Sequence, residues 1–96
     1  MNFNLMKKNS ALVTGNFNVL HPGHIRLLKY AKNFAKHLVV GVFSDSLAGD
    51  AVDINQELRQ EAVGAIDLVD EVVLIDKPLN EFIIERRPDI IVKGKE

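Results

Sequence analysis

The 96-residue sequence contains no cysteine and no tryptophan, and only 6% of its residues are aromatic. The lack of cysteine excludes disulfides, thiolate catalysis and thiolate zinc sites, and it fits a reducing compartment. No uncharged apolar run approaches the roughly 20 residues that a membrane-spanning helix needs, and the mean hydropathy is +0.04. We therefore expect a cytoplasmic protein with no membrane partner.

An excess of positive charge is also missing. The chain has 12 Lys and Arg against 13 Asp and Glu, a formal net charge of −1, which argues against nucleic acid as a partner. Residues 1–10 include Lys7 and Lys8 but no apolar core, so we do not expect a signal peptide there. We interpret residues 1–10 as a flexible lead-in and residues 11–96 as one domain.

Short runs of mainly β-branched residues recur along the chain, and they are continuous rather than alternating. This pattern is typical of strands buried on both faces of a parallel sheet. The runs are residues 11–14, 38–43, 72–75 and 90–92. Segments with the 3.6-residue period of a helix follow the first three runs, at residues 23–36, 55–69 and 79–86. The alternation predicts an α/β fold, a Rossmann-like three-layer sandwich with a parallel sheet.

Helix ends and loops can also be predicted. We expect Asn55 to be the N-cap of the second helix and His37 to cap the C-terminus of the first helix. Residues 48–54 are expected to form a polar loop. Because loops at the carboxyl ends of strands line the ligand crevice of an open α/β sheet, this loop and the one after Thr14 should both lie at the site.

The loop after the first strand carries a His-Pro-Gly-His run. Pro22 suits the first helical position because it has no N–H to leave unpaired, so His21 would be the N-cap and His24 would lie in the first turn. Two imidazoles beside free backbone N–H groups at a positive helix end form an anion site. Gly15 would let the chain pass close to a ligand, and Gly23 would keep a side chain off the approach. The arrangement suits a phosphate whose negative charge grows during in-line displacement.

Two other interpretations of this histidine pair are open. The imidazoles could be capping or surface groups without a chemical role, or they could be two ligands of a zinc ion, because positions i and i+3 are neighbours on a helix. No third carboxylate or histidine ligand stands nearby in the sequence. The phosphate interpretation is therefore favoured over zinc.

The same loop resembles the signature of a known family. The residues Gly15, Phe17, His21, Gly23 and His24 match the Gly-x-Phe-Asp-x-x-His-x-Gly-His pattern of the cytidylyltransferase-like nucleotidyltransferases. The wider chain is similar to the branch that contains glycerol-3-phosphate cytidylyltransferase and the heptose-1-phosphate adenylyltransferase domain. Similar segments are residues 20–31, 39–45, 55–59, 69–73 and 88–94.

The resemblance implies a reaction and its residues. A small phosphorylated acceptor such as a sugar phosphate would attack a nucleoside triphosphate that carries Mg²⁺, and pyrophosphate would leave. His21 and His24 would be catalytic at the α-phosphorus. The implied nucleotide-binding residues are Thr14, Gly15, Asn16, Phe17, Asn18, Gly23, Arg59, Lys93 and Gly94. Similarity to the adenylyltransferase branch at residues 88–94 favours ATP, with CTP as the alternative.

The sequence departs from the family pattern in three places. Asn18 stands where the family has Asp, which keeps an acceptor but removes a charge. Residues 45–53 contain no lysine, although this branch uses lysines there to meet phosphates, and their acidic character would repel a triphosphate unless magnesium intervenes. The Ser/Thr-rich segment that holds the β- and γ-phosphates in the family is absent from the sequence.

These departures lead to several expectations. The sheet would lack its C-terminal strand and helix, so the domain would be incomplete. The exposed face would be covered by a further domain of a longer chain or by a second copy in a homodimer. A nucleotide-binding module without turnover is the alternative to a nucleotidyltransferase.

Overall fold

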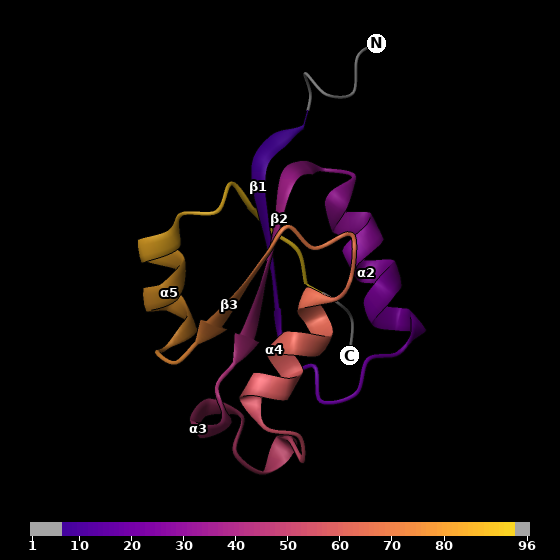
Figure 1. Ribbon diagram of the computed structural model, residues 1–96. Coiled ribbons are helices and arrows are strands. Elements are labelled where there is room, and N and C mark those ends of the chain that lie inside the picture. The colour runs from indigo at the N-terminus through magenta and orange to yellow at the C-terminus, as the bar shows by residue number, and fades with distance from the viewer. Residues whose placement is uncertain (1–6, 94–96) are drawn as a thin grey trace.

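The computed structural model describes residues 7–93, which form a parallel sheet with helices between its strands (Figure 1). The strands are β1 (Lys8–Gly15), β2 (Ala35–Phe43), β3 (Glu71–Ile75) and β4 (Ile90–Ile91), in the order β3-β2-β1-β4. The helices are α2 (Pro22–Lys32), α3 (Asp45–Ala48), the 3₁₀ turn η1 (Gly49–Ala51), α4 (Gln56–Gly64) and α5 (Leu79–Arg86). Every neighbouring strand pair is parallel, which confirms the predicted α/β class.

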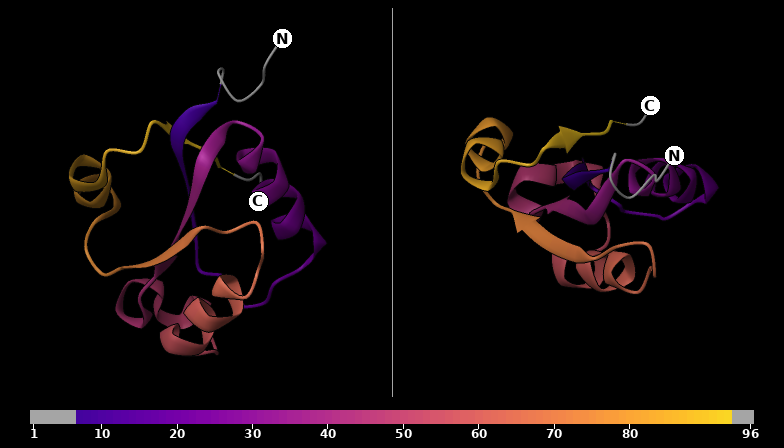
Figure 2. Two further views of the ribbon diagram at one scale, coloured as in Figure 1. Left: turned by 45° about the horizontal axis from the view of Figure 1, so that its top comes forward. Right: turned by 90° about the horizontal axis from the view of Figure 1, so that it is seen from above.

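Helices cover both faces of the sheet (Figure 2). Ala11 and Val13 point to the face that packs against Leu28 of α2 and against α4, whereas Leu12, between them, points to the face covered by Phe82 of α5. Because successive strand residues alternate between faces and both faces are buried, the middle of β1, residues 11–13, has no polar positions. The continuous apolar runs therefore predicted the sheet correctly.

The first helix is shorter than predicted, and its correction changes the place of His37. Helix α2 ends at Lys32, and β2 begins at Ala35 because the chain must reverse there to pair Ala35 with Lys8. The expectation that His37 caps this helix is wrong. His37 lies in β2, and the C-cap is Asn33.

The predicted polar loop over residues 48–54 is partly helical. Ser44 is the N-cap of α3 and accepts a hydrogen bond from the Leu47 N–H at 3.2 Å, and η1 follows without a break. Asn55 is the N-cap of α4, as predicted, and accepts from Leu58 N–H at 3.0 Å, but α4 ends at Gly64 rather than at residue 69. Strand β1 begins at Lys8, and residues 1–6 of the expected lead-in lie outside the described residues.

Glu71, the first residue of β3, joins three elements. Its carboxylate accepts hydrogen bonds from Arg86 of α5 and from His37 of β2, the latter with an Nε2–Oε1 distance of 2.9 Å. The Arg86 guanidinium, followed by the His37 imidazole, lowers the pKa of Glu71 below its ordinary value of 4.5. A carboxyl whose pKa is lower in the folded than in the unfolded chain stabilises the fold above the unfolded value, and this stabilisation is lost as the pH falls through the folded value.

We therefore expect Glu71→Gln to lower the free energy of unfolding at neutral pH by less than about 1 kcal/mol, because the ion pairs are partly exposed. The difference from the wild type should vanish at a pH well below 4.5, where both side chains are uncharged. Urea unfolding of both proteins at stepped pH measures it. A difference that does not change with pH would contradict this account of Glu71.

Candidate active site

The loop between β1 and α2 lies at the edge of the sheet where the parallel strands have their carboxyl ends (Figure 1). Two grooves flank it. A groove of about 490 Å³ lies beside His21 along the first turns of α2, and one of about 400 Å³ lies between the loop and α4. Arg26 and Lys29 line the first groove, whereas exposed apolar side chains such as Val19 and Leu58 line the second. The predicted loop therefore has space for ligands on two sides.

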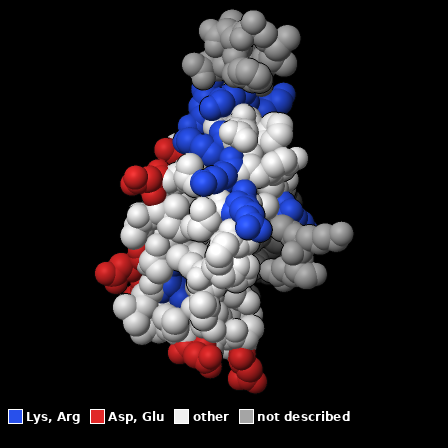
Figure 3. Space-filling view, turned by 90° about the vertical axis from the view of Figure 1, so that its right-hand side faces the viewer, with Lys and Arg blue, Asp and Glu red and all other residues white. Residues whose placement is uncertain are grey.

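Charge is distributed unevenly around this edge. On the side that carries α2, Lys and Arg gather over the upper part, and Asp and Glu gather at the lower end, the level of α3 in Figure 1 (Figure 3). Asp45 of α3 and Asp50 of η1 are exposed near this end. A triphosphate at the carboxyl edge would therefore meet acidic side chains close by, as the lysine-free sequence of residues 45–53 indicates.

His21 and His24 cap the first turn of α2 reciprocally. The Gly23 N–H donates to His21 Nδ1 at 3.0 Å, and the His21 N–H donates to His24 Nδ1 at 3.2 Å. The ring centroids lie 3.9 Å apart with an interplanar angle of 34°. His21 is the N-cap and Pro22 the first helical residue, as predicted. The two imidazoles are thus held together by the helix start that they cap.

These hydrogen bonds determine where each neutral imidazole carries its proton. Because Nδ1 of both rings accepts a backbone N–H, the proton of the neutral ring is on Nε2. In this tautomer Nε2–H is the donor group of each ring, the kind of group that suits a phosphate oxygen. Nδ1 of each ring is already engaged and would not be open to zinc, and within residues 7–93 no three His, Asp or Glu side chains are grouped to hold a metal.

One expectation about this helix end is wrong for the described structure. The backbone N–H groups of the first turn are not free, because Pro22 has none, Gly23 donates to His21 Nδ1, and the His24 N–H donates to the His21 carbonyl at 2.9 Å. The His21 imidazole itself accepts the Gly23 N–H that a phosphate would otherwise take. An anion at this end therefore meets the side chains first, with the helix dipole behind them.

The structure gives a different reason for a glycine at position 23 from the expected one, which was to keep a side chain off the approach of a ligand. A Cβ at this position would lie 2.8 Å from His21 Cε1, closer than real Cβ contacts, so the glycine makes room for the capping ring. At Gly15 a Cβ would lie 3.1 Å from Cε2 of Phe17, whose ring covers this end of β1. Both glycines therefore allow aromatic rings to lie close to the backbone of the site.

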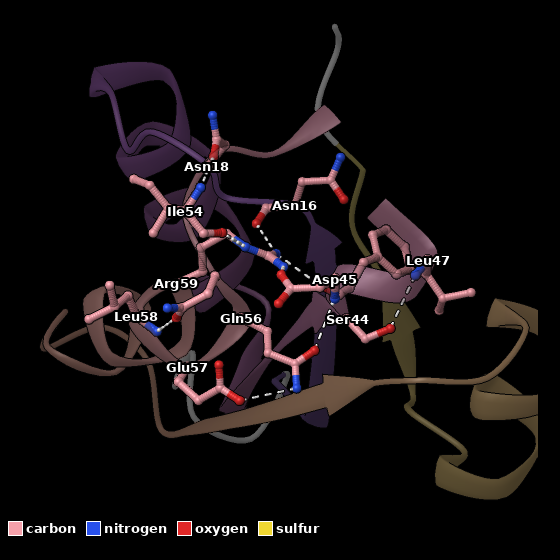
Figure 4. A network of polar contacts seen from close by, with 12 residues as sticks. Asn16, Asn18, Ser44, Asp45, Leu47, Ile54, Gln56, Glu57, Leu58 and Arg59 are labelled. Atoms are coloured by element: carbon pink, nitrogen blue, oxygen red, sulfur yellow. Dashed lines mark hydrogen bonds and ion pairs between the residues drawn. The ribbon is translucent and has the colours of Figure 1, made fainter. Parts of the chain in front are cut away.

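Phe17 has a left-handed backbone, with φ 51°, which costs a residue with a side chain about 1–2 kcal/mol. Its ring is buried and its centroid lies 5.4 Å from that of His24. Asn18, the residue that replaces the family's Asp, accepts hydrogen bonds from the N–H groups of Asp53 at 2.8 Å and Ile54 at 3.1 Å (Figure 4). The amide oxygen thus acts as the acceptor that the sequence comparison indicates.

Arg59 is fully buried beneath the groove of about 400 Å³ whose lining it belongs to, and its hydrogen bonds in Figure 4 go to protein atoms. Nε donates to the Ile54 carbonyl at 2.8 Å, and Nη1 donates to the carbonyls of Asn16 at 2.7 Å and Phe43 at 2.8 Å. Nη2 donates to Asp45 Oδ1 at 2.8 Å, and this bond lowers the pKa of Asp45 below its ordinary value of 3.8. The guanidinium has no exposed surface, so the expected contact with a nucleotide is not made from this conformation and stays a prediction.

The remaining predicted residues lie near the same edge or outside the described chain. Thr14 is the penultimate residue of β1. The Val92 N–H donates to the Leu12 carbonyl at 3.0 Å, which places the exposed Lys93 at the carboxyl end of β4, next to β1. Gly94 lies outside the described residues. Asp45, the partner of Arg59, was missed as a site residue, although its position directly after a buried strand was a usable signal.

Comparison of the sequence with models of known protein families identifies the family of this chain. The model of the family described as cytidylyltransferase-like matches residues 12–96 of the chain. The chain belongs to the cytidylyltransferase-like family. The family that its His-Pro-Gly-His motif resembles is thereby confirmed, as is the α/β Rossmann-like fold.

Several relatives share this cytidylyltransferase-like sequence. "Bifunctional protein HldE" of Campylobacter fetus subsp. fetus (strain 82-40) is 41% identical over 96 residues, which cover 93% of this chain and 21% of that protein. The protein of the same name from Koribacter versatilis (strain Ellin345) is 41% identical over 90 residues, 86% of this chain and 18% of that protein. This chain thus spans about a fifth of the length of these relatives.

A solved structure shows the same architecture. The crystal structure of the lipopolysaccharide core biosynthesis protein from Thermoplasma volcanium GSS1 aligns with a TM-score of 0.81 and 33% sequence identity. The alignment covers 86% of this chain and 71% of that one. Among the described residues of this cytidylyltransferase-like chain, no helix has the length and apolar character needed to cross a membrane.

Proposed function

We propose that this chain is the nucleotide-binding part of a nucleotidyltransferase. It would transfer a nucleotidyl group from ATP, or from CTP, to a small phosphorylated acceptor such as a sugar phosphate, and pyrophosphate would leave. The observation that carries the proposal is the pair of reciprocally capped imidazoles, His21 and His24, whose Nε2–H groups can donate to phosphate oxygens. Family membership supports the reaction class, and the resemblance of residues 88–94 to the heptose-1-phosphate adenylyltransferase branch favours a sugar phosphate as the acceptor.

Catalysis in this proposal consists of positioning and charge stabilisation. His21 and His24 would donate hydrogen bonds as negative charge develops around the α-phosphorus, from a helix start whose dipole has the favourable sign. Neither ring needs to remove a proton, because the attacking group is a phosphate oxygen that is already negative. Thr14, Gly15 and Asn16 would line the phosphate path at the end of β1, with Lys93 and Gly94 near the base and ribose.

Mg²⁺ would arrive with the nucleotide. Within the described residues no cluster of three potential ligands offers a cage for the ion, and magnesium characteristically keeps few protein ligands and binds substrate phosphates. It would neutralise part of the triphosphate charge beside the exposed carboxylates of α3 and η1. We therefore propose that affinity for the nucleotide depends strongly on magnesium.

Titration with ATP and with CTP, each with and without Mg²⁺, tests the binding step by calorimetry. Binding is expected only with Mg²⁺ present, and it should be weaker for CTP than for ATP. Pyrophosphate release is then measured with Mg²⁺-ATP and a set of sugar 1-phosphates. Absence of binding to either nucleotide with Mg²⁺ would contradict the proposal.

A module that binds a nucleotide without turnover is the second candidate function. It is favoured by the acidic surface at the carboxyl edge and by the lysine-free sequence of residues 45–53. The same experiment decides between the two. Nucleotide binding without pyrophosphate release assigns the chain to this second class.

A further inference from the structure

The left-handed turn at Phe17 connects the interior of the protein with the imidazole of His24. A non-glycine residue with positive φ persists only where its surroundings hold it, and such residues cluster at functional sites. The Phe17 ring lies between two site elements, over Gly15 on one side and 5.4 Å from the His24 ring centroid on the other. The orientation of this turn therefore sets the surface against which His24 rests.

Both neighbours of Phe17 are fixed by the segment that begins α4. On one side, the Asn16 carbonyl accepts from Arg59 Nη1 at 2.7 Å. On the other side, Asn18 Oδ1 accepts from the N–H groups of residues 53–54, at 2.8 and 3.1 Å (Figure 4). These bonds join positions more than 30 residues apart in the chain, so the turn is held by tertiary structure and not by its own sequence.

Arg59 is itself rigidly held. Its remaining donors bond the carbonyls of Ile54 and Phe43 and the Asp45 carboxylate, all at 2.8 Å. The side chain is fully buried, and no buried side-chain nitrogen or oxygen lacks a partner among the described residues. The planar fork of the guanidinium matches this set of acceptors in a way that an ammonium group cannot.

We infer that Arg59 and Asn18 are positioning residues that clamp the Phe17 turn and thereby orient His24 for phosphate, without touching the nucleotide themselves. This inference rests on the proposed nucleotidyltransferase function for its catalytic consequence only. It assigns Arg59 a different role from the direct nucleotide contact that family resemblance implies. Through these hydrogen bonds and the Phe17 ring, the clamp connects α3, α4 and the end of β2 to the imidazole of His24.

The first test needs no nucleotide. The ring resonances of His24 are recorded by NMR in the wild type and in Asn18→Ala, Asn18→Asp, Arg59→Lys and Arg86→Lys. Asn18→Ala and Arg59→Lys should shift these resonances, because the Phe17 ring moves. Asn18→Asp keeps the acceptor oxygen, so it should shift the resonances less than Asn18→Ala does, and Arg86→Lys, which disturbs a distant ion pair, should leave them in their wild-type positions. Unchanged His24 resonances in folded Asn18→Ala overturn the clamp, whether or not Arg59→Lys folds.

The second test separates positioning from nucleotide contact. With Mg²⁺-ATP, misplacement of His24 in Asn18→Ala and Arg59→Lys should lower kcat on the order of 100-fold and leave KM for ATP close to the wild-type value. A raised KM with unchanged kcat would show that these residues contribute to binding, and it would overturn the inference. If the wild type does not turn over ATP, the proposed function fails, while the NMR comparison still decides whether the clamp exists.

Discussion

His21→Asn should lose nucleotidyl transfer while the protein keeps its wild-type stability. Asparagine is among the best N-cap residues, and its Oδ1 can accept the Gly23 N–H in place of imidazole Nδ1, which accepts it at 3.0 Å. The variant has no group in the position of Nε2. Because removal of one preorganised donor to developing phosphate or oxyanion charge lowers kcat by about 100- to 1000-fold, we expect a loss of that size.

His21→Gln is the matched control, since its longer amide places an N–H near the Nε2 position and removes the acceptor near the backbone. It should retain more turnover than His21→Asn but lose about 1 kcal/mol of the free energy of unfolding, the usual effect of a lost N-cap. Pyrophosphate release and urea unfolding, measured on both variants, give the comparison. If His21→Asn turned over ATP as fast as the wild type, the His21 imidazole would only cap the helix and would have no chemical role.

Some of this fold could be predicted from the sequence, because buried strands and helices show themselves directly as apolar runs and apolar periodicity. Strand β2 and helix α5 follow from a continuous apolar run and from a helical segment bounded by Pro78 and Pro88. The end of α2 could not be predicted, because Ala35 fits a helical stripe and a strand equally well and is buried in either case. Ala35 belongs to a strand because it pairs with Lys8, and this pairing cannot be read from the sequence around Ala35.

The candidate site also has features that could be predicted from the sequence and features that could not. The caps at His21 and Asn55 are local, within three residues of their donors, and were predicted. The surroundings of Arg59 could not be, because its acceptors are mainly backbone carbonyls, which every residue has, and Asn16 is 43 positions away. Family resemblance suggested a ligand contact for Arg59, whereas the structure gives its guanidinium protein partners and no exposed surface.

Gly41 in the central strand β2 is the position where a single methyl group should disturb the interior most clearly. A Cβ there would lie 2.4 Å from Ile75 Cδ1 and 3.1 Å from its Cγ1, and Ile75 is fully buried. Glycine-to-alanine changes at compatible positions stabilise a protein by about 0.4–1 kcal/mol. Here overpacking should reverse the sign and lower the free energy of unfolding by about 1–3 kcal/mol.

Two further variants make the test of Gly41→Ala specific. Ile75→Val removes the clashing Cδ1 and alone should cost about 0.5–1.5 kcal/mol, so the double variant should be more stable than the sum of the single effects predicts. Gly64→Ala, at the end of α4, is the control, because its Cβ would lie 3.6 Å from Val72 Cγ2, an ordinary contact. If Gly41→Ala stabilised the chain as Gly64→Ala should, the tight contact with Ile75 would not exist.

The effect of Gly41→Ala should extend to the site because Ile75 is also a backbone partner of the loop after β2. Its carbonyl accepts the Ser44 N–H at 2.9 Å, and the adjacent Asp45 holds Arg59. A shift of Ile75 that accommodates the new methyl group would therefore move the anchor of the Phe17 clamp. We expect Gly41→Ala to shift the ring resonances of His24 and the double variant with Ile75→Val to restore them, whereas Gly64→Ala should leave them unchanged.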